Sequence, residues 1–85
     1  MNWETVGKKN LGNFTIVHMK GYDRSTSWTL HRFSIFNKGS TKSLFTEDYL
    51  SADSSHAKAR YQSLDTVGKV KKFLEYHTGS YKVVR

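Results

Sequence analysis

The segment from Ser63 to Gly79 reads SLDTVGKVKKFLEYHTG, and its spacing predicts an amphipathic helix. Apolar residues recur at steps of three or four, which places them on one side of a 3.6-residue period. The residues on this side are Leu64, Val67, Val70, Leu74 and His77, with Phe73 at the edge. Ser63 is placed to cap the first turn, Asp65 suits the positive end of the helix dipole, and Gly79 follows as a helix-ending residue. An isolated helix of this length is marginal in water, so we expect it to be stabilised by packing.

The chain before this helix carries strand patterns separated by turns. Residues 13–20 alternate apolar and polar side chains, and residues 27–36 are rich in aromatic and β-branched side chains. Residues 37–40 supply a turn, after which residues 41–46 fold back as the second arm of a hairpin. The register of this hairpin stays open, because a slip of one residue inverts both faces of the strands.

The segment between the hairpin and the helix has two interpretations. Residues 47–55 are acidic and rich in serine, which favours a long connection, and residues 56–62 alternate like a short strand leading into the helix. The alternative is that the C-terminal helix begins earlier, near Ser54. Its apolar stripe would contain Ala57, Tyr61 and Leu64.

The predicted fold class is α+β, in one domain that spans residues 1–85. Residues 13–62 form a small antiparallel β-meander of three to four strands, which packs on one C-terminal amphipathic helix. Residues 1–12 are expected to be a loosely attached arm in which Trp3 docks, and residues 80–85 to be a short final strand or a tail. Such a sheet leaves its second face in water unless something binds there.

Composition narrows the class of protein. The chain has no cysteine, which excludes disulfides and any zinc or iron–sulfur site with cysteine ligands. The first nine residues lack the apolar core of a signal peptide, and no apolar run is longer than two residues. We therefore expect a cytoplasmic protein that does not bind membranes. A chain of 85 residues buries only about two-thirds of its unfolded surface and is marginal alone, so homodimerisation is an open alternative.

The chain is strongly basic, with 14 Lys and Arg against seven Asp and Glu, a net charge of +7. Residues 1–46 hold seven basic and two acidic side chains. Residues 47–57 hold three acidic side chains and no basic one, and residues 58–85 hold seven basic and two acidic side chains. The positive charge therefore belongs to the folded body and attracts polyanions such as nucleic acid, or an acidic protein. The competing interpretation is that this charge only keeps a small domain in solution.

No catalytic or cofactor motif is present in the sequence. Histidines at positions 18, 31, 56 and 77 form no pair at metal-ligand spacing, and neither a nucleophile elbow nor a phosphate-binding glycine loop is found. The sequence therefore predicts a binding protein without metal or cofactor. The enzyme class that remains is a metal-independent ribonuclease, with His31 beside Arg32 or Tyr76 beside His77 as its acid–base and phosphate-binding groups.

The favoured function is nucleic-acid binding, with RNA preferred over duplex DNA because an exposed aromatic side chain can stack on an unpaired base. Lysine and arginine would contact phosphates, and Lys58 and Arg60 are expected to project to the same side of a strand. The predicted binding residues are Arg32, Lys42, Lys58, Arg60, Lys69, Lys71 and Lys72. The alternative is a small inhibitor or adaptor, of the kind that viruses and mobile elements encode, that binds a nucleic-acid enzyme or a toxin.

Overall fold

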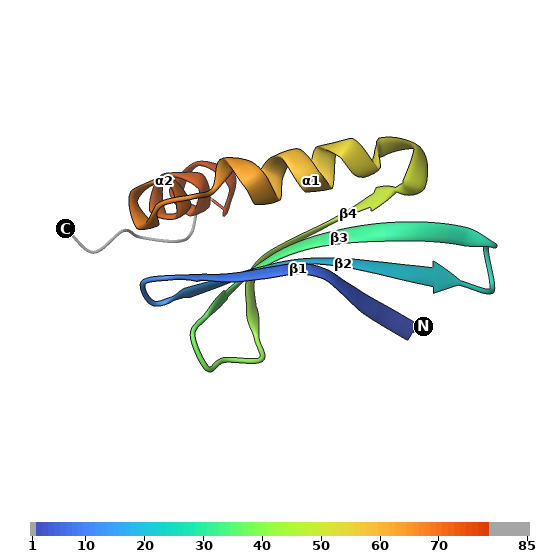
Figure 1. The fold of residues 1–85 in the computed structure, drawn as a ribbon, viewed down its shortest axis with the longest axis horizontal. Helices are drawn as coiled ribbons and strands as arrows, with labels where there is room; N and C mark the ends of the chain where they lie inside the picture. The colour runs from blue at the N-terminus through green and yellow to red at the C-terminus, as the bar shows by residue number, and fades with distance from the viewer. Residues whose placement is uncertain (1, 79–85) are drawn as a thin grey trace.

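The computed structural model describes residues 2–78 and has two layers (Figure 1). One layer is a four-stranded antiparallel sheet whose spatial order, β1-β2-β3-β4, follows the chain. The other layer is helical and covers one face of this sheet. The elements are β1 (Asn2–Leu11), β2 (Phe14–Asp23), β3 (Trp28–Asn37), β4 (Ser43–Leu50), the 3-10 turn η1 (Ser51–Asp53), α1 (Ser54–Ser63) and α2 (Val67–Thr78). The predicted α+β class with an antiparallel meander is confirmed, and the helical layer contains two helices instead of one.

The N-terminal segment is a strand and not the loosely attached arm that its composition predicts. β1 pairs with β2 along its whole length, with a register shift between Thr5 and Gly7. Trp3 docks as expected, since its ring lies so close to Gly21 that a Cβ added to that glycine would be 2.7 Å from the ring. The sequence does not predict this strand, because most of its residues are exposed at the sheet edge and its polar residues interrupt the alternation of apolar and polar side chains.

The segment between the hairpin and the C-terminal helix is also rearranged. β4 continues to Leu50 through the acidic residues that predicted a loop, and residues 56–62 lie in α1 and not in a strand. The alternative start near Ser54 is therefore correct, but α1 ends at Ser63 and is a separate helix, not an earlier start of the C-terminal one. Ala57 is fully buried and Tyr61 half-buried, which is the four-residue spacing of a helix face.

The predicted C-terminal helix begins later than its sequence pattern indicates. Ser63 is the last residue of α1, where its hydroxyl donates to the carbonyl of Arg60 at 3.0 Å. α2 starts at Val67, and the hydroxyl of Thr66 accepts the N–H of Lys69 at 3.2 Å. Thr66 therefore caps the helix in place of Ser63. Gly79 and the predicted final strand at residues 80–85 lie outside the described residues.

The core lies between the sheet and both helices. Its buried members are Phe14, Ile16, Phe33, Ile35, Leu64, Val70, Phe73 and Leu74. Val70 and Leu74 are fully buried, as the helix periodicity predicts, whereas His77 stays exposed and packs on the Phe73 ring with centroids 4.1 Å apart. The hairpin register is now fixed, with Ile35 opposite Phe45. No helix within residues 2–78 combines the length and apolar character needed to cross a membrane.

Candidate functional site

Lysines are concentrated at one end of the molecule. An antiparallel meander places the β1–β2 and β3–β4 turns at the same end, and the N–H of Lys38 donates to the carbonyl of Asn13 at 2.7 Å between them. α2 lies over the β1–β2 turn, with Val67 directly against Gly12, whereas the β3–β4 loop bends to the other side of the sheet (Figure 1). We call this region the lysine end. Its lysines are Lys8, Lys9, Lys38, Lys42, Lys69, Lys71 and Lys72.

The charge balance differs between the lysine end and the rest of the described chain. The lysine end holds seven lysines against two carboxylates, Asp65 and Glu75. The remainder of residues 2–78 holds five basic side chains and five carboxylates. The positive excess of the described residues therefore lies at one end, which is where the field attracts a polyanion most strongly.

Four of the seven predicted binding residues lie at the lysine end. Lys42 is exposed in the β3–β4 loop, Lys72 is exposed on α2, and Lys71 beside it is half-buried. Lys69 forms an ion pair with Asp65, with 2.8 Å between Nζ and Oδ1, and this contact lowers the pKa of the Asp65 carboxyl. Lys69 therefore offers less free charge to a ligand than Lys42 or Lys72.

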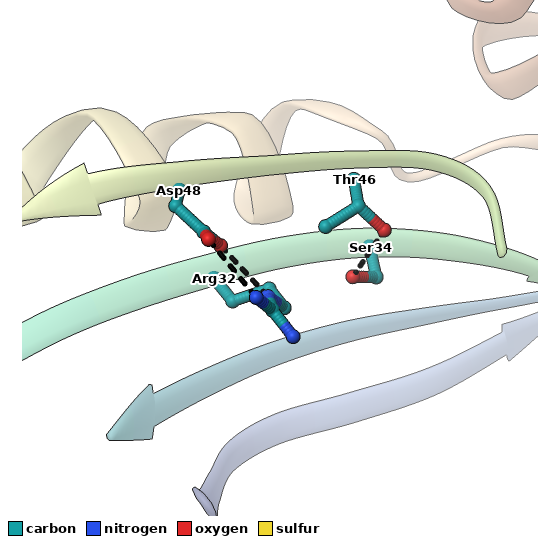
Figure 2. Close-up of polar contacts among 4 residues, drawn as sticks. All are labelled: Arg32, Ser34, Thr46 and Asp48. Atoms are coloured by element: carbon teal, nitrogen blue, oxygen red, sulfur yellow. Dashed lines mark hydrogen bonds and ion pairs between the residues drawn. The ribbon is translucent and has the colours of Figure 1, made fainter. Parts of the chain in front are cut away.

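Arg32 lies elsewhere, on the face of the sheet that no described helix covers, which we call the open face. Its guanidinium donates from Nε and Nη2 to the two carboxylate oxygens of Asp48 at 2.7 and 3.0 Å (Figure 2). These hydrogen bonds raise the pKa of the guanidinium. The same group lies 4.2 Å from the centroid of the Trp3 ring. Arg32 is therefore neutralised by Asp48 and held by an aromatic side chain.

Lys58 and Arg60 do not share a side, contrary to the expectation from a strand. They are two residues apart on α1, and residues at that spacing do not face each other on a helix. Lys58 is exposed, whereas Arg60 turns toward β4 and α2. The sequence prediction therefore combined two residues that the fold separates.

Three lysines of the lysine end were missed by sequence reasoning: Lys8, Lys9 and Lys38. Lys38 is exposed within the predicted turn at residues 37–40, and that turn was the available signal for it. Lys9 points toward the helices, where it donates to the Tyr61 carbonyl and lies 4.4 Å from the centroid of the Tyr61 ring. Burial lowers the pKa of Lys9, and the charge of Asp65 partly offsets this effect. Lys9 is therefore a packing residue, and the accessible charge belongs to its neighbours.

A second polar region is the groove between β4 and α1, which we call the Arg60 groove. Its volume is about 690 Å³, and it is lined by Glu47, Asp48, Tyr49, His56, Ala59, Arg60 and Ser63. Nε of Arg60 lies 4.0 Å from a carboxylate oxygen of Glu47 and 3.5 Å from the Tyr49 hydroxyl. Its Nη1 lies 3.4 Å from Nε2 of His77 on α2.

The ribonuclease pairs predicted from adjacency in the sequence are not the groups that the fold assembles. His31 and Arg32 are neighbours on β3, so their side chains point to opposite faces of the sheet. Tyr76 is 85% exposed, whereas His77 reaches Arg60. The fold therefore joins His77 to Arg60 and separates His31 from Arg32.

His18 is buried in the sheet, where its contacts contribute to packing. Nε2 of His18 lies 3.0 Å from Nδ1 of His31, and the His18 side chain is covered by α1. Burial lowers the pKa of His18, and the nearby charges of His31 and Lys58 lower it further. Among residues 2–78, no three potential metal ligands cluster closely enough to hold an ion.

The open face carries apolar side chains around the Arg32–Asp48 pair. Leu30 pairs with Leu50 across β3 and β4, and the Trp3 ring lies beside them on Gly21. Trp28 is 55% exposed and Leu50 is 42% exposed. Farther along the same face, the hydroxyls of Ser34 and Thr46 lie 3.1 Å apart (Figure 2).

Comparisons of the chain with protein-family models, with curated proteins and with solved structures give no significant match.

Proposed function

We propose that this protein binds nucleic acid, with the lysine end contacting phosphates and with RNA preferred over duplex DNA. The observation that carries the proposal is the concentration of the positive excess at one end of the described chain. Lysine side chains bind phosphate as point charges, and releasing counterions from nucleic acid makes such binding favourable at low salt. A charge that served only to maintain solubility would have no reason to gather at one end.

The preference for RNA rests on an aromatic side chain beside these lysines. Tyr76 is 85% exposed on α2 and follows Lys72 by four residues, so the two lie on the same helix face. An exposed aromatic ring stacks on an unpaired base for about 1–3 kcal/mol. A paired base inside a duplex is not available for this contact, so Tyr76 favours single-stranded RNA.

The proposal is tested by fluorescence anisotropy with a labelled single-stranded RNA and a duplex DNA of equal length, from 50 to 300 mM KCl. The decisive variant replaces Lys38, Lys42 and Lys72 with glutamine. The matched control replaces Lys20, Arg24 and Lys58, which are also exposed, and removes the same total charge.

Each lost phosphate contact is expected to reduce the salt slope by about 0.7, so the lysine-end variant loses about 2 in slope and roughly 100-fold in affinity near 0.1 M salt. The control variant retains most of the salt slope and most of the affinity. Tyr76→Ala weakens RNA binding by about 5- to 150-fold, the equivalent of losing one stacked base, and leaves duplex binding unchanged. Equal losses from the two triple variants, or no binding at 50 mM KCl, would contradict the proposal.

A second candidate function is binding of a protein partner, and the open face favours it. Protein interfaces are enriched in exposed aromatic residues and arginine at their centres, and Trp28, Leu30 and Leu50 share the open face with Arg32, which is already neutralised by Asp48. The test is an affinity purification from lysate with and without nuclease treatment, using the wild-type protein, Trp28→Ser and the variant with glutamine at Lys38, Lys42 and Lys72. A partner that requires Trp28 but not Lys38, Lys42 and Lys72 supports this function. A partner that nuclease removes contradicts it.

A further inference from the structure

Three types of group that can catalyse phosphodiester cleavage meet at Arg60, which lines the Arg60 groove. Glu47 comes from β4, Arg60 from α1 and His77 from the last turn of α2. Glu47 approaches Nε of the guanidinium, whereas His77 approaches Nη1, so a carboxylate and an imidazole flank the same cation. The side chains of Glu47 and Arg60 remain 39% and 36% exposed, so a substrate can reach them.

The dimensions of the groove suit a nucleotide. Pockets for small ligands have volumes of about 300–1,000 Å³, and the Arg60 groove has about 690 Å³. Tyr49 and His56 line it as well, with their rings 6.0 Å apart and edge to face. Aromatic surfaces in such a groove can contact a nucleobase while the guanidinium holds the adjacent phosphate.

Position along the chain connects this groove with the lysine end. His77 directly follows Tyr76, the exposed aromatic residue beside Lys72. The ring of His77 is fixed by packing on Phe73, with 4.1 Å between centroids, and Arg60 lies over the same Phe73 ring at 5.1 Å. An RNA strand that follows the outer face of α2 therefore reaches the imidazole that contacts Arg60.

We propose that the Arg60 groove cleaves RNA without a metal ion, by transfer of the phosphodiester to the neighbouring 2′-hydroxyl. The carboxylate of Glu47 removes the proton from the 2′-hydroxyl, and the 2′-oxygen forms a bond to phosphorus. The bond from phosphorus to the 5′-oxygen breaks, and protonated His77 donates a proton from Nε2 to that leaving oxygen. The products are a 2′,3′-cyclic phosphate and a free 5′-hydroxyl.

Arg60 stabilises the negative charge that builds on the phosphoryl oxygens during this step. Neutral His77 accepts a hydrogen bond from Arg60, and protonated His77 donates to an oxygen held by the same guanidinium. Tyr49, at 3.5 Å from Nε, acts as a positioning residue that helps to hold Arg60 toward the groove. The proposal rests on the RNA-binding part of the proposed function, because the substrate must be RNA.

The experiment uses the full chain with a 5′-labelled RNA and the DNA of the same sequence, both in EDTA. We expect RNA cleavage with 2′,3′-cyclic phosphate ends, identified by mass spectrometry, and intact DNA, because DNA lacks the attacking hydroxyl. Glu47→Gln is expected to reduce the rate by 10²- to 10⁴-fold, the usual contribution of a general base, and His77→Gln to reduce it similarly. Glu4→Gln, an exposed carboxylate on β1, is the matched control and keeps the wild-type rate.

Two further measurements separate catalysis from folding and from binding. RNA affinity of Glu47→Gln, measured by anisotropy, stays within a few-fold of wild type, which shows that the variant is folded and binds. RNA affinity of His77→Gln is likewise expected to stay within a few-fold of wild type. Wild-type protein that binds RNA but yields no cyclic phosphate overturns this proposal alone. Protein that neither binds nor cleaves RNA overturns both proposals, and cleavage that Glu47→Gln leaves unchanged overturns the assignment of the groove.

Discussion

Acidification below pH 6.5 is expected to destabilise the fold through His18. The side chain of His18 is 5% exposed, and its Nε2 lies 3.0 Å from Nδ1 of His31. Burial first, and then the charges of His31 and Lys58, lower its pKa from the ordinary value of 6.5. The folded state therefore holds His18 neutral at a pH where the unfolded chain already binds the proton.

The sign and size of the effect follow from proton linkage. Between the unfolded pKa of about 6.5 and the lower folded pKa of His18, the unfolded state binds more protons, so the free energy of unfolding falls as the pH falls. The contribution of His18 is fully present above pH 6.5 and is lost as the pH falls toward the folded pKa. For a single histidine the loss between pH 7.5 and 5.5 is at most about 1.4 kcal/mol.

The assay is urea unfolding, followed by tryptophan fluorescence, at pH 7.5 and 5.5. With a urea m-value of about 1–3 kcal/mol/M, the full loss shifts the unfolding midpoint by roughly 0.5–1.4 M. His18→Gln removes the titrating group and is expected to flatten this dependence, whatever its stability at pH 7.5. His56→Gln replaces an exposed histidine and is expected to retain it. The reasoning would be refuted if the wild-type midpoint did not change between these pH values, or if the midpoint of His18→Gln changed by the same amount.

The other predictions concern packing and turns, and both are measured as changes in the free energy of urea unfolding. Leu74→Ala removes a fully buried side chain and is expected to cost about 2–5 kcal/mol, whereas Tyr76→Ala on the same helix costs less than about 0.5 kcal/mol. Similar losses would mean that α2 is not packed as described. Gly12 and Gly39 both have positive φ, 58° and 81°, but a Cβ at Gly12 would lie 2.7 Å from Val67 whereas a Cβ at Gly39 meets open space. Gly39→Ala is expected to cost about 1–2 kcal/mol for the backbone conformation, and Gly12→Ala about 1–3 kcal/mol more for the clash; equal costs would contradict the contact of Gly12 with α2.

The sequence predicts secondary structure well where one face of an element is buried and the other is exposed to solvent. In α2 the apolar spacing identified Val70 and Leu74, which are fully buried, because a helix on a sheet has one protected side. In β2 and β3, alternating and aromatic residues identified the central strands of the sheet. β1 was missed because Lys8, Lys9 and Asn10 interrupt its pattern, and an edge strand is stabilised by backbone pairing that leaves little trace in side-chain polarity.

α1 shows why a short segment can remain ambiguous. The sequence of residues 56–62 fits an alternating strand, and it also fits a helix whose buried face contains Ala57 and Tyr61. Packing decides in favour of the helix. Ala57 is completely buried in the contact with the sheet, and Tyr61 supplies the ring and the carbonyl that Lys9 contacts. The partner of Tyr61 is 52 residues away, and local spacing contains no information about such a contact.

The features of the candidate sites also divide into those that the sequence determines and those that only the fold determines. The sequence alone determined the sign of the charge, the absence of cysteine and the apolar face of α2, because composition and periodicity are local properties of the chain. Only the tertiary structure gathered the lysines of two turns and of α2 at one end, paired Arg32 with Asp48, and brought Glu47 and His77 to Arg60. These groups come from separate elements, so their proximity depends on how the sheet pairs and where the helices pack, which no local pattern specifies.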